Sequence, residues 1–327
     1  MLCRRPPSTL ITALAATVSL AMLLVQAING LPGGKESPTT GAPLVVQQPL
    51  GGLGGGETIR EIHQETPFSL VALTSGDLSG TSARVRAKKA DGSWGPWYDA
   101  ENLEGVGADQ PGPRGTDPIF VGRTTTVQIA VTRRPDAPAT PTPAPHDGNR
   151  PALGYIPATV EQPFGENINA VLISPPEAPA DLAPLPNAVT PPGQPPHIIN
   201  RAEWGADESM RCGEPRYDNR IAAGVVHHSA GGNDYTPQDS AGIVRSIYEY
   251  HTRTLGWCDI AYNALVDKYG QVFEGRAGGM TRPVEGSHTG GFNHNTWGVA
   301  MLGDFETVPP TPIQLRTTAR LLGWVLG

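Results

Sequence analysis

Residues 221–232 read IAAGVVHHSAGG, residues 248–276 read YEYHTRTLGWCDIAYNALVDKYGQVFEGR, and residues 286–305 read GSHTGGFNHNTWGVAMLGDF. Six of the chain's eight histidines lie in or beside this part of the sequence. The apolar pair before His227 and His228 places both at the end of a short strand, where successive side chains point to opposite faces. Only one of the two can therefore face a given cleft. This concentration of imidazoles predicts a functional site.

The same part of the chain shows helix and strand patterns in turn. Apolar residues at helical spacing predict a helix that begins near Asp239 and ends at Gly256. The segments 260–266 and 271–276 read as two strands joined by a turn, and the continuously apolar run 297–302 reads as a buried strand. We therefore expect an α/β domain here.

These motifs together resemble the peptidoglycan recognition protein and zinc N-acetylmuramoyl-L-alanine amidase family (type 2, phage-lysozyme-like), in a secreted actinobacterial form. The resemblance covers about residues 197–327 and implies a mixed central sheet flanked by helices. By position, it implies that His227 binds zinc and that Tyr262 helps to polarise the scissile amide. The positions that match the family's peptide-binding groove are His251, Trp257, His288 and Asn293.

The chemistry expected of such a site agrees with these residue types. A catalytic zinc takes about three protein ligands and an open position for water, whose pKa falls to about 7. One imidazole at a strand end supplies a single ligand, and a tyrosine hydroxyl can donate to a developing oxyanion. In the family the other ligands follow the last long helix, whereas this sequence stops within that helix at Gly327. We therefore expect a C-terminally truncated domain whose remaining Zn²⁺ ligands lie beyond residue 327.

This departure leaves three classes of function open. The first is zinc-dependent hydrolysis of the amide between N-acetylmuramic acid and L-alanine in peptidoglycan, in cell-wall turnover, with this chain itself inactive. The second is a non-catalytic module that binds peptidoglycan, because two expected ligands are absent from the sequence. The third is a structural protein of the cell envelope. The dipeptide Gly256-Trp257 resembles the family version that prefers meso-diaminopimelate stems, where Asn-Phe accompanies lysine stems.

The first thirty residues predict a secretory signal peptide. Arg4 and Arg5 precede an apolar run over 10–25, and Val25-Gln26-Ala27 offers a cleavage site. The alternative is a membrane anchor, since a largely apolar run of sixteen residues approaches the length needed to span a bilayer. We expect a secreted or cell-envelope monomer that meets the membrane only through its signal peptide.

Export also bears on the cysteines and on charge. Once the signal is removed, Cys212 and Cys258 remain, and an oxidising compartment favours a disulfide between them. The family has a comparable bridge; the alternative is that one of these cysteines replaces a missing zinc thiolate.

The formal net charge is −7, and loss of two signal-peptide arginines makes it more negative. An acidic protein of this kind does not bind nucleic acid by charge alone.

The region before the amidase-like domain divides by composition. Residues 31–55 are rich in Gly, Pro and Thr and are expected to be flexible. Residues 56–175 alternate short strand patterns with turn signals, which predicts an all-β, sandwich-like module. Its Pro-rich insertion at 135–151 and the Pro-rich segment 176–196 read as extended linkers.

One aromatic group in the β-rich module has two interpretations. Trp94, Trp97 and Tyr98 could form a platform for sugars. Aromatic residues in strands more often pack in the core or against a neighbouring strand. The sequence favours the packing interpretation and does not assign the module a role.

Overall fold

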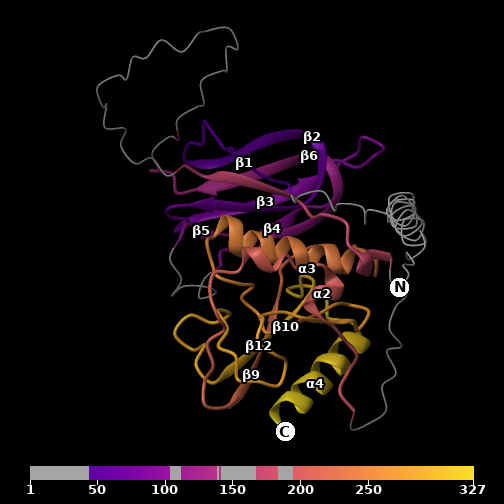
Figure 1. Cartoon of the computed structure of the whole chain (residues 1–327). Coiled ribbons are helices and arrows are strands. Elements are labelled where there is room, and N and C mark those ends of the chain that lie inside the picture. Colours follow the sequence, from indigo (N-terminus) through magenta and orange to yellow (C-terminus); the bar gives the residue numbers. More distant parts are fainter. Residues whose placement is uncertain (1–43, 104–111, 138–139, 141–166, 183–193) are drawn as a thin grey trace, which may run out of the picture. The chain divides into compact units, whose positions relative to one another are not determined.

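The computed structural model describes residues 44–103, 112–137, 140, 167–182 and 194–327 (Figure 1). The predicted signal peptide at 1–30 and most of the insertion predicted at 135–151 lie outside the described residues. Residues 42–327 form one compact unit. No helix in the described part of the chain is long and apolar enough to cross a membrane.

The β-rich module is a seven-stranded antiparallel sheet with the path β1-β7-β2-β6-β3-β4, in which β5 pairs with β2. Its strands are β1 (Leu44–Pro49), β2 (Gly56–Ser75), β3 (Thr81–Ala87), β4 (Tyr98–Ala100), β5 (Arg114–Gly115), β6 (Ile119–Arg133) and β7 (Asn169–Ser174). Alternation along β3 buries Ala83 and Val85 and turns Arg84 outward. This is the all-β module that the sequence predicts.

Two features of this sheet differ from the sequence prediction. Strand β1 lies within 31–55, which the composition predicted to be flexible, and the buried Leu50 and Leu53 follow it. Hydrogen bonding to β7 and burial of these two leucines explain the order of a Gly-rich segment. Two strands are also much longer than the short strand patterns predicted over 56–175, since β2 has 20 residues and β6 has 15.

The amidase-like module contains a five-stranded mixed sheet in the order β8-β11-β10-β12-β9. Its strands are β8 (Ile198–Ile199), β9 (Ala223–His228), β10 (Ala264–Val266), β11 (Val272–Glu274) and β12 (Thr296–Met301). The β10–β11 pair is antiparallel, and the other three pairings are parallel. This arrangement confirms the predicted mixed α/β sheet.

Helices accompany this sheet and the segment before it. They are the short helices η1 (Pro179–Leu182), α2 (Arg201–Trp204) and η2 (Glu208–Met210), then α3 (Asp239–Glu249), the π-helical turn η3 (Tyr250–Thr254) and α4 (Pro312–Leu326). The helix ends near Gly256, as the sequence predicts. The π-helical turn η3 extends α3 to Thr254, and Gly256 follows with a φ of 73°. Thr311 caps α4 by accepting a hydrogen bond from the Gln314 backbone N–H.

The two sheets share buried contacts. One hydrophobic cluster joins Leu70, Phe120 and Val171 of the β-rich module to Tyr250 and Tyr262 of the amidase-like module. The Tyr250 hydroxyl donates to the Leu73 carbonyl at 3.2 Å, although the two residues are 177 positions apart. The rings of Phe120 and Tyr235 meet edge to face, with centroids 6.3 Å apart. The β-rich module therefore contributes to the packing around η3.

Candidate functional site

His227 lies near the end of β9, at the edge of the mixed sheet. Its Nε2 lies 3.1 Å from His288 Nδ1, and its ring centroid lies 5.6 Å from that of Tyr262. The next residue in the strand, His228, projects to the other face, as strand alternation requires. The structure thus separates the two neighbouring histidines and places only His227 with the other predicted site residues.

The second side of the site comes from η3 and the loop that follows it. His251 stacks beside Trp257, with centroids 4.6 Å apart, and lies 6.1 Å from the Tyr262 ring. Its Nδ1 accepts a hydrogen bond from the Ala261 backbone N–H at 3.2 Å. This bond fixes the tautomer, because an accepting Nδ1 leaves the proton on Nε2. That buried Nε2 has no partner among the described residues, so it is available to a ligand.

His288 is held in a tight backbone cradle. A Cβ added at Gly286 or Gly298 would overlap the His288 ring, so glycine is required at both positions for this packing. The ring is fully buried, and its Nδ1 also contacts the Thr289 hydroxyl at 3.0 Å. His288 therefore has a fixed place opposite His227.

Asn293 has a different position from the other predicted residues. Its side-chain oxygen accepts a hydrogen bond from the Thr289 backbone N–H at 2.9 Å, which braces the loop that carries His288. Its side chain is buried, and its Nδ2 has no partner among the described residues. The structure brings His227, His251, Trp257, Tyr262 and His288 into one ring cluster, with Asn293 supporting the adjacent loop.

Burial sets the protonation states in this cluster. It lowers the pKa of His251 and of His288 to about 3, and lowers that of His227, which also lies beside His228. These imidazoles are therefore neutral at pH 7, the form that binds metals. Burial raises the pKa of Tyr262 well above its usual value. Its hydroxyl remains protonated and can donate a hydrogen bond.

The residues present do not complete a zinc site at His227. Among the described residues, the one group of three His, Cys, Asp or Glu ligand atoms within 4.8 Å of one another is Glu101, His228 and Glu306. In that group His228 Nδ1 accepts a hydrogen bond from the Phe305 backbone N–H at 3.4 Å, and His228 Nε2 lies 3.6 Å from a Glu101 carboxylate oxygen. The group contains neither His227 nor another predicted site residue.

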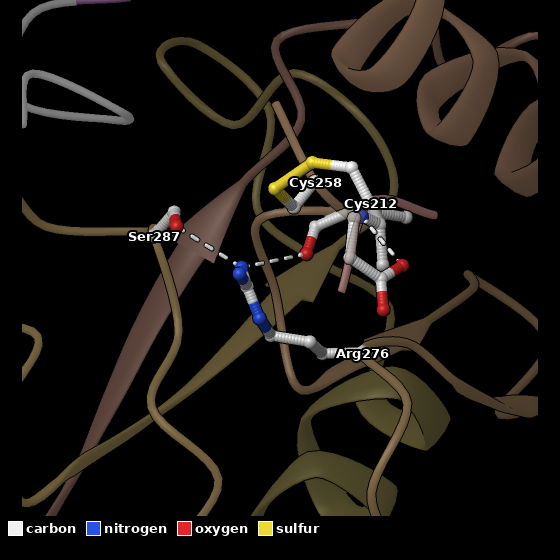
Figure 2. The surroundings of a disulfide bond; sticks show 6 residues. Cys212, Cys258, Arg276 and Ser287 are labelled. Atoms are coloured by element: carbon white, nitrogen blue, oxygen red, sulfur yellow. Dashed lines mark hydrogen bonds between the residues drawn. A yellow bond between two sulfur atoms is a disulfide. The ribbon is translucent and has the colours of Figure 1, made fainter. Parts of the chain in front are cut away.

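The predicted disulfide between Cys212 and Cys258 is present, with the Cα atoms 4.5 Å apart (Figure 2). It leaves neither cysteine free to act as the zinc thiolate considered from the sequence. A cavity of about 580 Å³ adjoins the bridge. Its lining consists of Arg211, Cys212, Gly213, Glu214, Pro215, Arg216, Cys258, Asp259, Arg276, Ala277, Glu285 and His294.

Arg276 is a residue of this cavity that the sequence reasoning did not single out. Its Nη1 donates to the Ile260 carbonyl at 3.2 Å and to the Ser287 hydroxyl at 3.0 Å, next to His288 (Figure 2). The guanidinium thus links the cavity at the disulfide to the loop of the ring cluster. The sequence signal that could have identified Arg276 is its position just after strand β11, within segment 248–276.

Comparison with known proteins agrees with this geometry. Residues 217–327 match the family described as N-acetylmuramoyl-L-alanine amidase. Peptidoglycan recognition protein 1 of Mus musculus is 34% identical over 129 residues, which are 38% of this chain and 66% of that protein. Peptidoglycan-recognition protein SC2 of Drosophila melanogaster is 32% identical over 38% of this chain and 65% of that protein. The chain belongs to the peptidoglycan recognition protein and type 2 amidase family.

The family match concerns part of each molecule. The chain spans just under two thirds of the length of these two relatives. Among solved structures, Drosophila peptidoglycan recognition protein SA is 31% identical over 39% of this chain and 71% of that chain, with a TM-score of 0.35. Residues 35–148 match the family described as Rv3811 N-terminal galactose-binding domain-like. The chain thus joins a galactose-binding-like domain to an amidase-family domain.

Proposed function

We propose that the ring cluster binds the muramyl end of a peptidoglycan stem peptide, and that the protein hydrolyses the amide between N-acetylmuramic acid and L-alanine with Zn²⁺ as cofactor. One observation carries this proposal: His227, Tyr262, His251, Trp257 and His288, drawn from three separated motifs, meet in one place. Isolated core histidines would have no reason to converge in this way.

The individual side chains have roles that fit amide recognition. The Tyr262 hydroxyl makes no hydrogen bond with a described residue, so it is free to donate to a substrate carbonyl. His251 Nε2 and Asn293 Nδ2 are buried donors without partners, and a bound ligand would satisfy them. His227 would provide one zinc ligand. The described residues do not complete a ligand set around it.

The proposed substrate is peptidoglycan of the meso-diaminopimelate type. Its side chain carries one more carboxylate than lysine, so a matching site needs a cation near the end of the stem peptide. The cavity of about 580 Å³ begins at Cys258, directly after Gly256-Trp257, and its lining includes Arg211, Arg216 and Arg276. Arginine binds carboxylates through two parallel hydrogen bonds. The lining also holds Glu214, Asp259 and Glu285, and Arg216 forms an ion pair with Glu285 at 3.0 Å, so the proposed preference rests on the resemblance of Gly256-Trp257.

A second candidate is recognition without cleavage. It is favoured because, among the described residues, no group of three His, Cys, Asp or Glu ligand atoms includes His227. Both candidates place the working protein outside the cytoplasm, and the disulfide between Cys212 and Cys258 agrees with an oxidising compartment. We propose a secreted or cell-envelope monomer with no nucleic-acid partner, associated with the membrane only through its signal peptide.

The deciding experiment measures zinc content and release of stem peptide from diaminopimelate-type peptidoglycan, for the wild type and for His227→Ala. Zinc bound in a His227-dependent way, together with release of stem peptide, supports hydrolysis. Binding of a soluble muropeptide without zinc and without release supports recognition alone. A folded protein that shows neither binding nor release contradicts both candidates.

Equal binding of lysine-type and diaminopimelate-type muropeptides contradicts the substrate preference.

A further inference from the structure

The outward face of β3 carries a row of cations interleaved with indole rings. Arg86 lies 4.4 Å from the centroid of Trp97 and 5.1 Å from that of Trp94, and Arg84 lies 5.4 Å from Trp97. The row ends at Lys88, whose Nζ is 5.5 Å from the Trp94 centroid. The indoles are half-buried and stack with cations on the surface instead of entering the core. The predicted packing against a neighbouring strand therefore takes the form of cation–π contacts.

A basic pocket continues from the end of this row. It has a volume of about 420 Å³, which lies within the range of about 300–1,000 Å³ typical of sites for small molecules. Its lining is Pro67, Lys88, Lys89, Ala90, Arg123, Thr124, Thr125 and Thr126. No acidic residue belongs to this lining. Hydrogen bonds from the Thr124 hydroxyl to the Lys88 carbonyl at 2.9 Å, and between Thr126 and His63 at 2.9 Å, stiffen the wall.

One cation at the far end of this surface has a carboxylate partner. Arg84 forms an ion pair with Glu57 at 2.8 Å. The exposed cations Lys88, Lys89 and Arg123 form no ion pair with any carboxylate that the structure describes. Hydrogen bonds from Ser93 lower the pKa of Asp91, and the nearby Lys89 lowers it further. In a chain of net charge −7, three neighbouring cations that form no ion pair with a described carboxylate are a local exception that favours an anionic ligand.

We propose that this basic face, defined as Arg86, Lys88, Lys89, Arg123, Trp94 and Trp97, binds a phosphate-bearing glycan attached to the cell wall. Several cations around one pocket suit a phosphate group, which presents oxygens in several directions, and a lysine ammonium acts on it as a compact point charge. Stacking of Arg86 on two indoles fixes that side chain, so less conformational freedom is lost when it binds. The choice of a wall glycan rests on the proposed function in peptidoglycan.

This role would make the β-rich module an anchor that holds the ring cluster close to its polymeric substrate. Two weak sites on one chain raise the overall affinity for a surface that carries both ligands, because the second binding step becomes intramolecular. The basic face should accordingly matter for insoluble wall material and not for a soluble muropeptide.

The test is co-sedimentation of the full chain with insoluble peptidoglycan, either carrying its phosphodiester-linked glycan or stripped of it with hydrofluoric acid. The variant Lys89→Gln/Arg123→Gln is compared with Arg220→Gln/Arg316→Gln, which also removes two exposed cations that have no ion pair in the described structure. At about fivefold per cation, the first variant should bind intact wall roughly 25-fold more weakly than the wild type, and the control should not.

The outcomes separate this proposal from the proposed function. Loss of binding to intact wall, with unchanged binding of a soluble muropeptide, supports the basic face as an independent site. Wild-type affinity in the Lys89→Gln/Arg123→Gln variant, or equal wild-type binding to intact and stripped wall, overturns it. Failure of the proposed function would instead appear as absence of soluble muropeptide binding in the wild type.

Discussion

His251 combines deep burial with an unsatisfied ring nitrogen, and both properties have measurable consequences. Its side chain is 1% exposed, and its Nε2 has no partner among the described residues. A core histidine kept for packing alone would normally have both nitrogens paired. The missing partner leaves His251 Nε2 as a donor that a bound ligand could satisfy, a detail that the sequence pattern could not contain.

Burial of His251 predicts a dependence of stability on pH. Burial lowers its pKa to about 3, whereas in the unfolded chain the pKa is about 6.5, so between these values only the unfolded state takes up the proton. Stability is full above pH 6.5 and falls as the pH drops toward 3, by about 1.4 kcal/mol per pH unit. Urea unfolding at pH 7 and pH 5 should show a fall about 2 kcal/mol larger in the wild type than in His251→Asn. The same fall in both proteins would contradict the neutral buried state.

Tyr262→Phe separates binding from catalysis. Because the hydroxyl bonds to no described residue, its removal should change the free energy of unfolding by less than about 0.5 kcal/mol. In zinc-loaded, hydrolytically competent protein it should lower kcat for stem-peptide release by a factor of about 10² to 10³. Muropeptide affinity should stay within about threefold. A kcat equal to that of the wild type would exclude Tyr262 from the reaction.

Five residues that the resemblance assigned to one site lie together in the structure: His227, Tyr262, His251, Trp257 and His288. Their roles stay predictions. The glycine cradle of His288 and the Arg276 contact were missed because they depend on backbone approach between segments distant in sequence, which no local pattern encodes.

At the level of elements, the disulfide ties η2 to the loop that carries Trp257. The bridge closes a segment with a sequence separation of 46 residues. Loss of such a crosslink enlarges the conformational freedom of the unfolded chain, and Cys212→Ser/Cys258→Ser should lower the free energy of unfolding by about 3–4 kcal/mol.

Thermal or denaturant unfolding of the double variant measures this change. Wild-type protein treated with a reductant is the matched control and should lose a similar amount of stability. A loss below about 1 kcal/mol in both samples would show that the bridge does not constrain the unfolded chain.

Regular elements with a strong local pattern were predictable, and elements that depend on distant partners were not. The buried strand predicted at 297–302 corresponds to β12, and the strands predicted at 260–266 and 271–276 contain β10 and β11. Strand β1 is ordered through its pairing with β7, which lies more than 100 positions away in the sequence. A local pattern does not reveal such a partner, so the Gly-rich composition around β1 suggested flexibility. The π-helical turn η3 has no sequence pattern of its own.

At the level of the whole molecule, the shared cluster around Tyr250 predicts cooperative unfolding of residues 42–327. Phe120 belongs to that cluster and packs against Tyr235. Calorimetry should therefore show one transition with calorimetric and van't Hoff enthalpies in agreement. Phe120→Ala should lower the stability of the single transition by about 3–5 kcal/mol. Two separate transitions in the wild type would contradict a common core.

Composition did not predict that the two modules pack against each other, because the Pro-rich segment 176–196 suggested an extended linker between them. In the structure, Asp181 of that segment forms an ion pair with the buried Arg245 of α3 at 2.6 Å. The Arg245 guanidinium also donates to the Trp204 carbonyl at 2.7 Å. Part of the predicted linker is therefore packed against the amidase-family domain.

The central claim is that the ring cluster is a binding site for the peptidoglycan stem. Isothermal titration of a soluble diaminopimelate-type muropeptide into the wild type, His251→Ala, Trp257→Ala and the control Arg316→Gln tests it most directly. We predict one site per chain, an affinity at least about tenfold weaker in the two cluster variants, and no change in the control. Absence of binding to the folded wild type, or equal binding by all four proteins, would contradict the claim.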